Sequence, residues 1–282
     1  MKRNVFRIML ELTSKQPWLH DKSQALEELL FEECQDDETR ELLIDLINRF
    51  EFLDNNRYQF LMRKIALDIV TEPQLHEQST LISAMSIGSG VDSGQAIIYS
   101  LKLFLQELNW TNHKLINDAM QAYKAFKNNA PLKDIILVDE FVGSGKTVID
   151  RVDTIKRQFS IARNDDFTIK VKVLAATEKG ISNVLAEGID ITSEIKIKKG
   201  ISDYYTGEEA KEMRGLMLAM ENILSKEYKG RNMPTMGYGE AEALYYRKDI
   251  NLPNSVFPIF WWAEYLNKSA RKTLLFRAMG DA

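Results

Sequence analysis

The stretch Ile135-Ile-Leu-Val-Asp-Glu-Phe-Val-Gly-Ser-Gly-Lys-Thr147 decides the fold of this chain. Four apolar residues run into two adjacent carboxylates and then into a short loop with two glycines, an order typical of a buried parallel strand that ends at a binding loop. Apolar residues recur at helical spacing after the loop, which predicts a helix there. The free N–H groups and the positive end of that helix face the loop, so the expected ligand is an anion.

Composition narrows the class of protein. The 282 residues are 45% hydrophobic and 28% charged, which suits one large globular domain or two modest ones. The net charge of -4 gives no general electrostatic case for binding nucleic acid or a membrane. Cys34 is the only cysteine, and no apolar run approaches the ~20 residues of a membrane span. We therefore expect a cytoplasmic protein without a membrane partner.

The pattern along the chain predicts two regions. Residues 1–75 read as a helical N-terminal region, and residues 76–282 read as an α/β domain with a C-terminal aromatic extension. Strands are expected over 81–87, 168–176 and 191–197, besides the one at Ile135. Helices are expected between them, so the fold class is α/β with a parallel, Rossmann-like sheet.

Two further segments carry expectations. Leu115, Ile116, Met120 and Tyr123 recur at a spacing that predicts a helix. The segment 251–262 holds several aromatic residues and two prolines, which predicts a fixed, buried tail.

A second glycine-rich loop, at residues 88–94, follows the first expected strand. Such a loop is most often only a turn. However, the carboxyl ends of parallel strands lie at one edge of a sheet, so this loop and the central loop are expected to meet there. The candidate binding residues in this loop are Ser89, Gly90, Val91, Asp92, Ser93 and Gly94.

The central loop fits more than one chemistry. A nucleotide-triphosphate P-loop would need a glycine at position 140, where the chain has Glu140, so an NTPase stays only as an alternative. Asp139 and Glu140 can instead accept hydrogen bonds from a vicinal diol, while residues 143–147 donate to a phosphate. Together these describe a ribose 5-phosphate. A purely structural role, in which the two acids only cap a helix or face solvent, also stays open.

These residues resemble the signature of type I phosphoribosyltransferases, in which a hydrophobic strand, two acids, two apolar residues and a Ser/Thr/Gly loop precede a helix. The resemblance covers about residues 80–200. It implies that Asp139 and Glu140 hold the ribose hydroxyls of phosphoribosyl pyrophosphate and act in catalysis. It also implies that the 5-phosphate is bound by Gly143, Ser144, Gly145, Lys146 and Thr147. Residues 88–94 fall where this family places its pyrophosphate loop.

Two departures from the family pattern bear on substrate geometry. The order Asp-Glu replaces the commoner Asp-Asp or Glu-Asp, and Lys146 is unusual in a 5-phosphate loop. A narrower resemblance covers more of the chain: the helical start, Asp-Ser-Gly at 92–94, the central loop and the aromatic tail resemble phosphoribosyltransferase-like proteins of bacterial antiviral systems, including retrons. This implies an effector in phage defence, with a reverse transcriptase and its nucleic acid as partners.

In the mechanism that the resemblance implies, a nitrogen nucleophile attacks the anomeric carbon as magnesium pyrophosphate leaves. The Mg²⁺ is expected to be carried by the substrate, because the chain shows no His or Cys cluster with ligand spacing. No residue is marked as the general base, although Glu178 and Asp92 are candidates by position. A non-catalytic module that senses a ligand or docks a partner is the alternative from another class.

Overall fold

The computed structural model describes residues 3–87, 93–128 and 132–279, and the chain divides into two compact units. Unit 2 comprises residues 54–196, and unit 1 combines residues 1–53 with residues 197–282. Helix α4 (Asn55–Thr71), which the sequence grouped with the N-terminal region, packs against α5 and β5 and so belongs to unit 2. The chain therefore leaves unit 1, builds an α/β unit and then returns.

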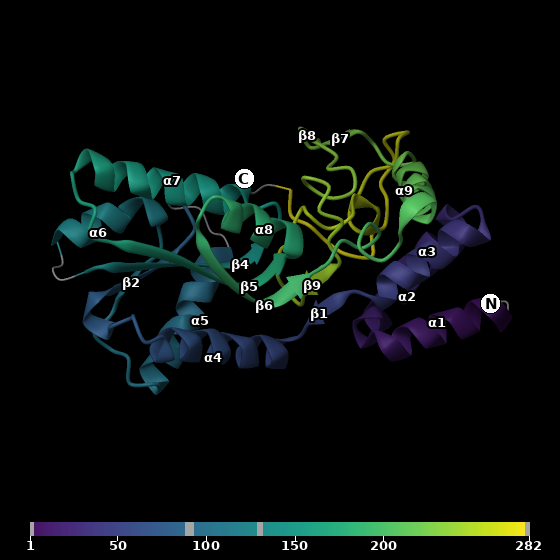
Figure 1. Ribbon diagram of the computed structural model, residues 1–282. Coiled ribbons are helices and arrows are strands. Elements are labelled where there is room, and N and C mark those ends of the chain that lie inside the picture. Colours follow the sequence, from purple (N-terminus) through teal and green to yellow (C-terminus); the bar gives the residue numbers. More distant parts are fainter. Residues whose placement is uncertain (1–2, 88–92, 129–131, 280–282) are drawn as a thin grey trace. The chain divides into compact units, whose positions relative to one another are not determined.

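Unit 2 is built on a five-stranded sheet with the order β3-β2-β4-β5-β6 (Figure 1). The pairs β2–β3, β2–β4 and β4–β5 are all parallel. The strands are β2 (Thr80–Ala84), β3 (Lys114–Ile116), β4 (Asp134–Val142), β5 (Thr168–Thr177) and β6 (Asp190–Ile197). The predicted α/β class with a parallel sheet is confirmed.

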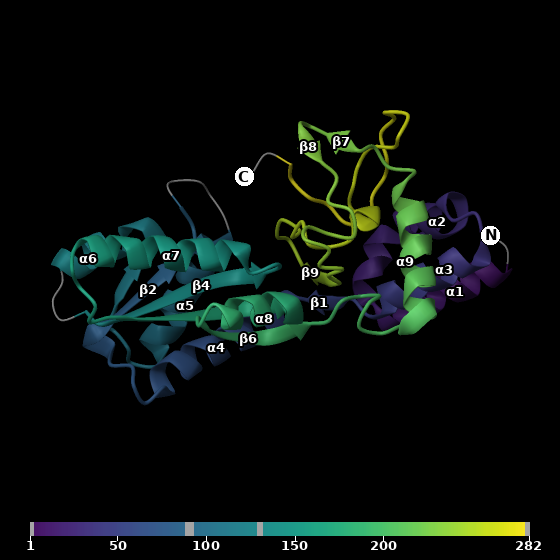
Figure 2. The ribbon, with the colours of Figure 1, turned by 45° about the horizontal axis from the view of Figure 1, so that its top comes forward.

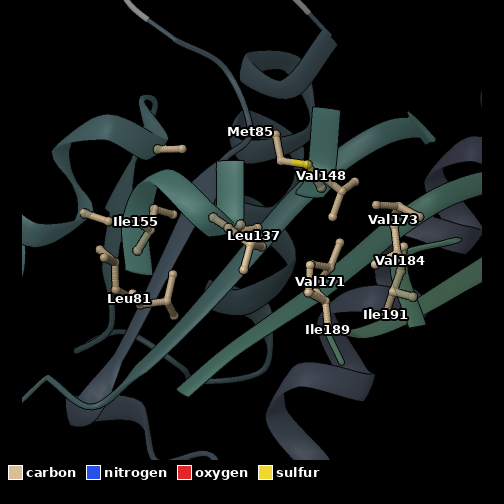
Figure 3. Packing of buried hydrophobic residues seen from close by; sticks show 14 of the residues in the cluster. Leu81, Met85, Leu137, Val148, Ile155, Val171, Val173, Val184, Ile189 and Ile191 are labelled. Atoms are coloured by element: carbon tan, nitrogen blue, oxygen red, sulfur yellow. The ribbon is translucent and has the colours of Figure 1, made fainter. Parts of the chain in front are cut away.

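Helices cover both faces of this sheet, as a buried parallel sheet requires. Helices α6 (Ala122–Asn128) and α7 (Lys146–Ile161) lie on one face, and α4 and α5 (Ser93–Glu107) lie on the other (Figure 1). On the α7 side, Leu137 of β4 lies opposite Val171 of β5, and both pack in a core with Val148 and Ile155 of the helix (Figure 3). This core fixes the start of α7 at the carboxyl end of β4.

The helix predicted around Leu115 was partly wrong. Leu115 and Ile116 form the edge strand β3, and α6 begins only at Ala122. A short apolar run fits a strand or a helix equally well, and here the open edge of β2 supplies hydrogen-bond partners that a helix would not use.

Unit 1 is helical and irregular. Its regular elements are α1 (Arg3–Lys15), α2 (Ser23–Glu28), α3 (Asp37–Asn48), β1 (Glu51–Leu53), α9 (Gly207–Glu221), β7 (Glu227–Tyr228), β8 (Arg231–Asn232) and β9 (Tyr245–Arg247). Strands β1 and β9 pair in parallel although nearly 200 residues separate them. Across the described residues, no helix combines the length and the apolarity that crossing a bilayer requires.

The aromatic tail of unit 1 is buried, as expected. Phe257, Phe260, Trp261 and Trp262 are each at most 4% exposed. Tail residue Arg271 makes two hydrogen bonds to the carboxylate of Glu33, at 2.8 and 2.7 Å, and donates to two backbone carbonyls. The side chains of Arg271 and Glu33 are 1% and 6% exposed, so this ion pair joins the tail to the N-terminal helices inside the unit.

We expect the stability of the protein to fall as the pH rises from about 5 to 8, because of Glu221. This side chain is 1% exposed, and burial raises the pKa of its carboxyl to about 7. The pKa of this carboxyl is lower in the unfolded state. Between the two pKa values the folded protein therefore binds a proton that the unfolded chain does not bind, which stabilises the fold. This stabilisation is lost as the pH rises through the folded-state pKa. The free energy of unfolding, measured by urea denaturation, should fall by about 1 to 3 kcal/mol between pH 5 and 8.

The matched variant is Glu221→Gln, which keeps an acceptor for the Met236 N–H that now bonds both carboxylate oxygens. This variant should flatten the pH dependence between pH 5 and 8. An unchanged slope would mean that another group is responsible.

Candidate functional site

The two predicted carboxylates lie at the end of β4. Both Asp139 and Glu140 are strand residues, so their side chains leave opposite faces of the sheet. Asp139 is half-buried, and its Oδ1 accepts hydrogen bonds from the Glu140 N–H at 2.7 Å and from the Ser93 hydroxyl at 3.2 Å. Glu140 is only 2% exposed. Asp139 is therefore the carboxylate of the pair that a ligand can reach directly.

The Ser93 contact brings the end of the second glycine loop to the first carboxylate. Ser93 and Gly94 open α5, and the Ser93 hydroxyl reaches Asp139 across 46 positions of sequence. The other candidates in that loop, Ser89 to Asp92, lie outside the described residues. The described residues thus bring the end of the second loop to the end of β4, and the expected meeting of the two loops stays a prediction.

The central loop turns the chain from β4 into α7 within three residues, Gly143 to Gly145. Gly145 has φ 81°, a left-handed conformation that costs glycine little. No side chain caps the start of α7, although the Ser144 hydroxyl accepts the Lys146 N–H at 3.4 Å. A helix start without a side-chain cap presents N–H donors, and it is a ready site for an anion.

The start of the neighbouring helix α8 (Glu178–Ala186) holds this loop from behind. The Thr177 hydroxyl donates to the Gly143 carbonyl at 2.5 Å and accepts the Gly180 N–H at 2.8 Å. The Asn183 amide donates to the Ser144 carbonyl at 3.0 Å. With two loop carbonyls bound on this side, the shape of the loop is fixed.

Two glycines allow this close approach. A Cβ on Gly180 would lie 2.2 Å from the Gly143 carbonyl oxygen, and a Cβ on Gly145 would lie 2.8 Å from the Gly180 carbonyl oxygen. Sequence reasoning missed Thr177, Gly180 and Asn183. The available signal was Thr177 directly after a strand, because threonine is a preferred helix N-cap.

The register of the sheet argues against the P-loop alternative. Phe141 and Val142 are paired with Ala175 and Ala176 of β5, so β4 continues through positions that a P-loop would use as its phosphate cradle. Lys146 is exposed, and its ammonium forms an ion pair with Asp150, one turn along α7, at 2.7 Å. This is an ordinary (i, i+4) surface pair.

The sequence offered two residues as a general base, Glu178 and Asp92. Glu178, a candidate general base, is exposed in the first turn of α8, beside the Thr177 cap. Asp92 lies outside the described residues. No cluster of three or more His, Cys, Asp or Glu side chains suited to a metal occurs in residues 3–87, 93–128 and 132–279.

A parallel sheet whose central strand ends in an acidic pair and a glycine loop before a helix is the arrangement of a phosphoribosyltransferase-like fold. The family model named PRTase-CE matches residues 18–277, and the chain belongs to this family. A search of curated proteins finds no match.

Solved structures with a similar fold include several phosphoribosyltransferases. Orotate phosphoribosyltransferase from Aeropyrum pernix is 13% identical, with a TM-score of 0.33, over 51% of this chain and 72% of that chain. Hypoxanthine-guanine phosphoribosyltransferase from Schistosoma mansoni, in complex with IMP, is 14% identical, with a TM-score of 0.34, over 52% of this chain and 65% of that chain. A hypothetical protein from Neisseria gonorrhoeae with bound ppGpp is 16% identical, with a TM-score of 0.33, over 60% and 97%.

Proposed function

We propose that this protein binds phosphoribosyl pyrophosphate, or a related ribose 5-phosphate ligand, at the end of β4 and acts as a pentosyltransferase. The observation that carries the proposal is the rigid loop Gly143–Gly145 at the uncapped start of α7, directly after Asp139. An anion-binding loop next to an accessible carboxylate provides both halves of a ribose 5-phosphate site.

Asp139 and Glu140 have different roles in this proposal. Asp139 accepts hydrogen bonds from the ribose hydroxyls, with Ser93 orienting its Oδ1. Glu140, being buried, acts through its charge, which favours the positive sugar ring of an oxocarbenium-like transition state. The N–H groups at the start of α7 and the hydroxyls of Ser144 and Thr147 hold the 5-phosphate.

Magnesium enters this proposal as part of the substrate. Pyrophosphate carries Mg²⁺, which usually keeps several waters and needs only one or two protein carboxylates. The partly exposed carboxylate of Asp139 suits such a hard cation, so the residues present fit the ion. The metal supplies charge neutralisation for the leaving pyrophosphate.

Calorimetry with phosphoribosyl pyrophosphate and Mg²⁺ tests the proposal on wild type and on the variants Asp139→Asn, Glu140→Gln and both together. We expect wild type to bind and Asp139→Asn to weaken binding about tenfold or more, because a charge-assisted hydrogen bond contributes about 1.5 to 3 kcal/mol. Glu140→Gln alone should change binding less and slow pyrophosphate release, because the buried carboxylate acts on the charged transition state. Asp153→Asn is the matched control, since Asp153 is an exposed carboxylate further along α7.

Absence of heat with wild type would contradict ligand binding at this site. Binding without release of pyrophosphate, across a panel of bases and nucleotides, would favour the alternative of a non-catalytic sensor or docking module on the same fold. ATP hydrolysis that is lost in Lys146→Ala would instead support the NTPase.

We propose further that the protein is a cytoplasmic effector of a retron-type antiphage system, with a reverse transcriptase and its nucleic acid as partners. The support is the resemblance of the Asp-Ser-Gly segment, the central loop and the aromatic tail to such effectors. In a phage-plaque assay with the complete system, protection should be lost in the double variant at Asp139 and Glu140. Protection that is unchanged would separate the defence role from this site.

A further inference from the structure

A second candidate site is a pocket of about 240 Å³ in unit 1 (the second pocket), and none of its described lining residues belongs to the β4 site. One wall is the β7–β8 hairpin, which contributes Tyr228 and Lys229, and the other is the C-terminal tail, which contributes Phe276 and Arg277. Trp261, whose side chain is buried, also lines the pocket. Hairpin and tail are the green and yellow segments at the top of unit 1 in Figure 2.

The described lining combines aromatic rings with positive charge and contains no carboxylate. Its three aromatic side chains are Tyr228, Trp261 and Phe276, and its two cations are Lys229 and Arg277. By contrast, the pocket between α1 and α3 mixes three acidic with three basic side chains. Aromatic rings beside a lysine ammonium suit a ligand that is both aromatic and anionic.

The walls are held in place by hydrogen bonds. The Arg231 guanidinium donates to the Met279 carbonyl at 3.1 Å, and the Ala278 N–H donates to the Asn251 side chain at 2.8 Å. The Trp261 indole donates to the Val256 carbonyl at 2.9 Å. A ligand therefore meets a preformed site and loses little free energy to ordering the protein.

Lys229 is presented by a strained turn. Lys229 and Gly230 have φ 50° and 73°, the conformation of a two-residue hairpin turn in which Asn and Gly are preferred. In the described chain Lys229 forms no ion pair, and its ammonium lies 5.3 Å from the centre of the Tyr228 ring. Phe276 is 74% exposed at the mouth of the pocket, which is unusual for a large aromatic side chain.

We propose that this pocket binds a nucleoside monophosphate, with the base against the rings of Tyr228 and Phe276 and the phosphate at Lys229. The volume of about 240 Å³ is small for a ligand pocket, so it suits a single mononucleotide rather than a longer ligand. This site shares no described lining residue with the proposed ribose 5-phosphate site.

Calorimetry on the full chain with AMP, GMP, CMP and UMP tests this proposal, with ribose 5-phosphate as the probe that lacks a base. At least one nucleotide should bind, and Phe276→Ser should weaken that binding by about fivefold or more, because a stacked base is lost. Lys229→Asn should also weaken it several-fold, since Asn tolerates the turn but removes the charge. Neither change touches the core, so thermal unfolding should stay as in wild type.

Matched controls come from the same unit. Lys226→Asn removes a charge from the segment just before the turn, at a lysine that bonds Asn222 and does not line the pocket, and Phe6→Ser removes another exposed ring. Both should bind like wild type. The Asp139→Asn/Glu140→Gln variant should keep this nucleotide binding even if it loses phosphoribosyl pyrophosphate.

Three results would overturn the proposal. The first is that none of the four nucleotides binds, and the second is that Phe276→Ser and Lys229→Asn bind like wild type. The third is that a single-stranded oligonucleotide binds far more tightly than any mononucleotide, because the pocket would then be part of a longer nucleic-acid surface.

Discussion

Gly180→Ala is expected to abolish detectable binding of phosphoribosyl pyrophosphate and to destabilise the protein by about 2 kcal/mol. The added methyl would lie 2.2 Å from the Gly143 carbonyl oxygen and 3.0 Å from the Thr177 hydroxyl, so the loop and the start of α8 must separate. Alanine would otherwise favour the helix, and the clash outweighs that gain. Separation moves the N–H donors that are proposed to hold the 5-phosphate. Calorimetry and urea unfolding measure the two effects.

Gly215→Ala is the matched control for this variant. Gly215 lies within α9, and a Cβ there has no neighbour within 4 Å. This substitution should stabilise the protein by about 0.5 to 1 kcal/mol and leave ligand binding unchanged. If Gly180→Ala were as stable as wild type, the close contact between the loop and α8 would be wrong. If it were less stable and still bound the ligand fully, the loop would not be the phosphate site.

Arg271→Met is expected to destabilise the protein by about 3 to 5 kcal/mol. The side chains of Arg271 and Glu33 are both almost fully buried, so removing the arginine leaves a carboxylate without its cation in the interior of unit 1. It also removes the donors to the carbonyls of Trp262 and Ile259. The free energy of unfolding from urea denaturation provides the measurement, with Glu33→Gln as the reciprocal variant.

Arg271→Met combined with Glu33→Leu should recover part of the loss, because no unpaired charge remains. The control is Lys211→Met, which breaks an exposed pair with Glu208 on α9 and should change stability by about 0.5 kcal/mol at most. An effect of Arg271→Met as small as that of Lys211→Met would contradict the buried ion pair.

Sequence reasoning identified the parallel sheet and the loop that follows β4, because both are local patterns. The apolar run from Ile135 to Val138 is mostly β-branched, which favours a strand covered on both faces, and the glycines that follow it permit an immediate turn into a helix. The same pattern marked Asp139 and the loop as a candidate site. It did not show that Glu140 is buried and Asp139 accessible, since that difference depends on the helices that cover each face.

Long-range contacts decided the features of the fold and of the site that local patterns did not predict. Leu115 and Ile116 became strand β3 because β2 had an open edge, and Thr177, Gly180 and Asn183 became supports of the loop because α8 packs beside α7. Glu33 and Arg271 meet across 238 positions. The sequence by itself determined the α/β class and the strand–loop–helix unit, because hydrophobic period and turn chemistry are properties of neighbouring residues. Only the tertiary structure decided which side chains support the loop, join the tail to the N-terminal helices and line the second pocket, because such pairings depend on how distant segments pack.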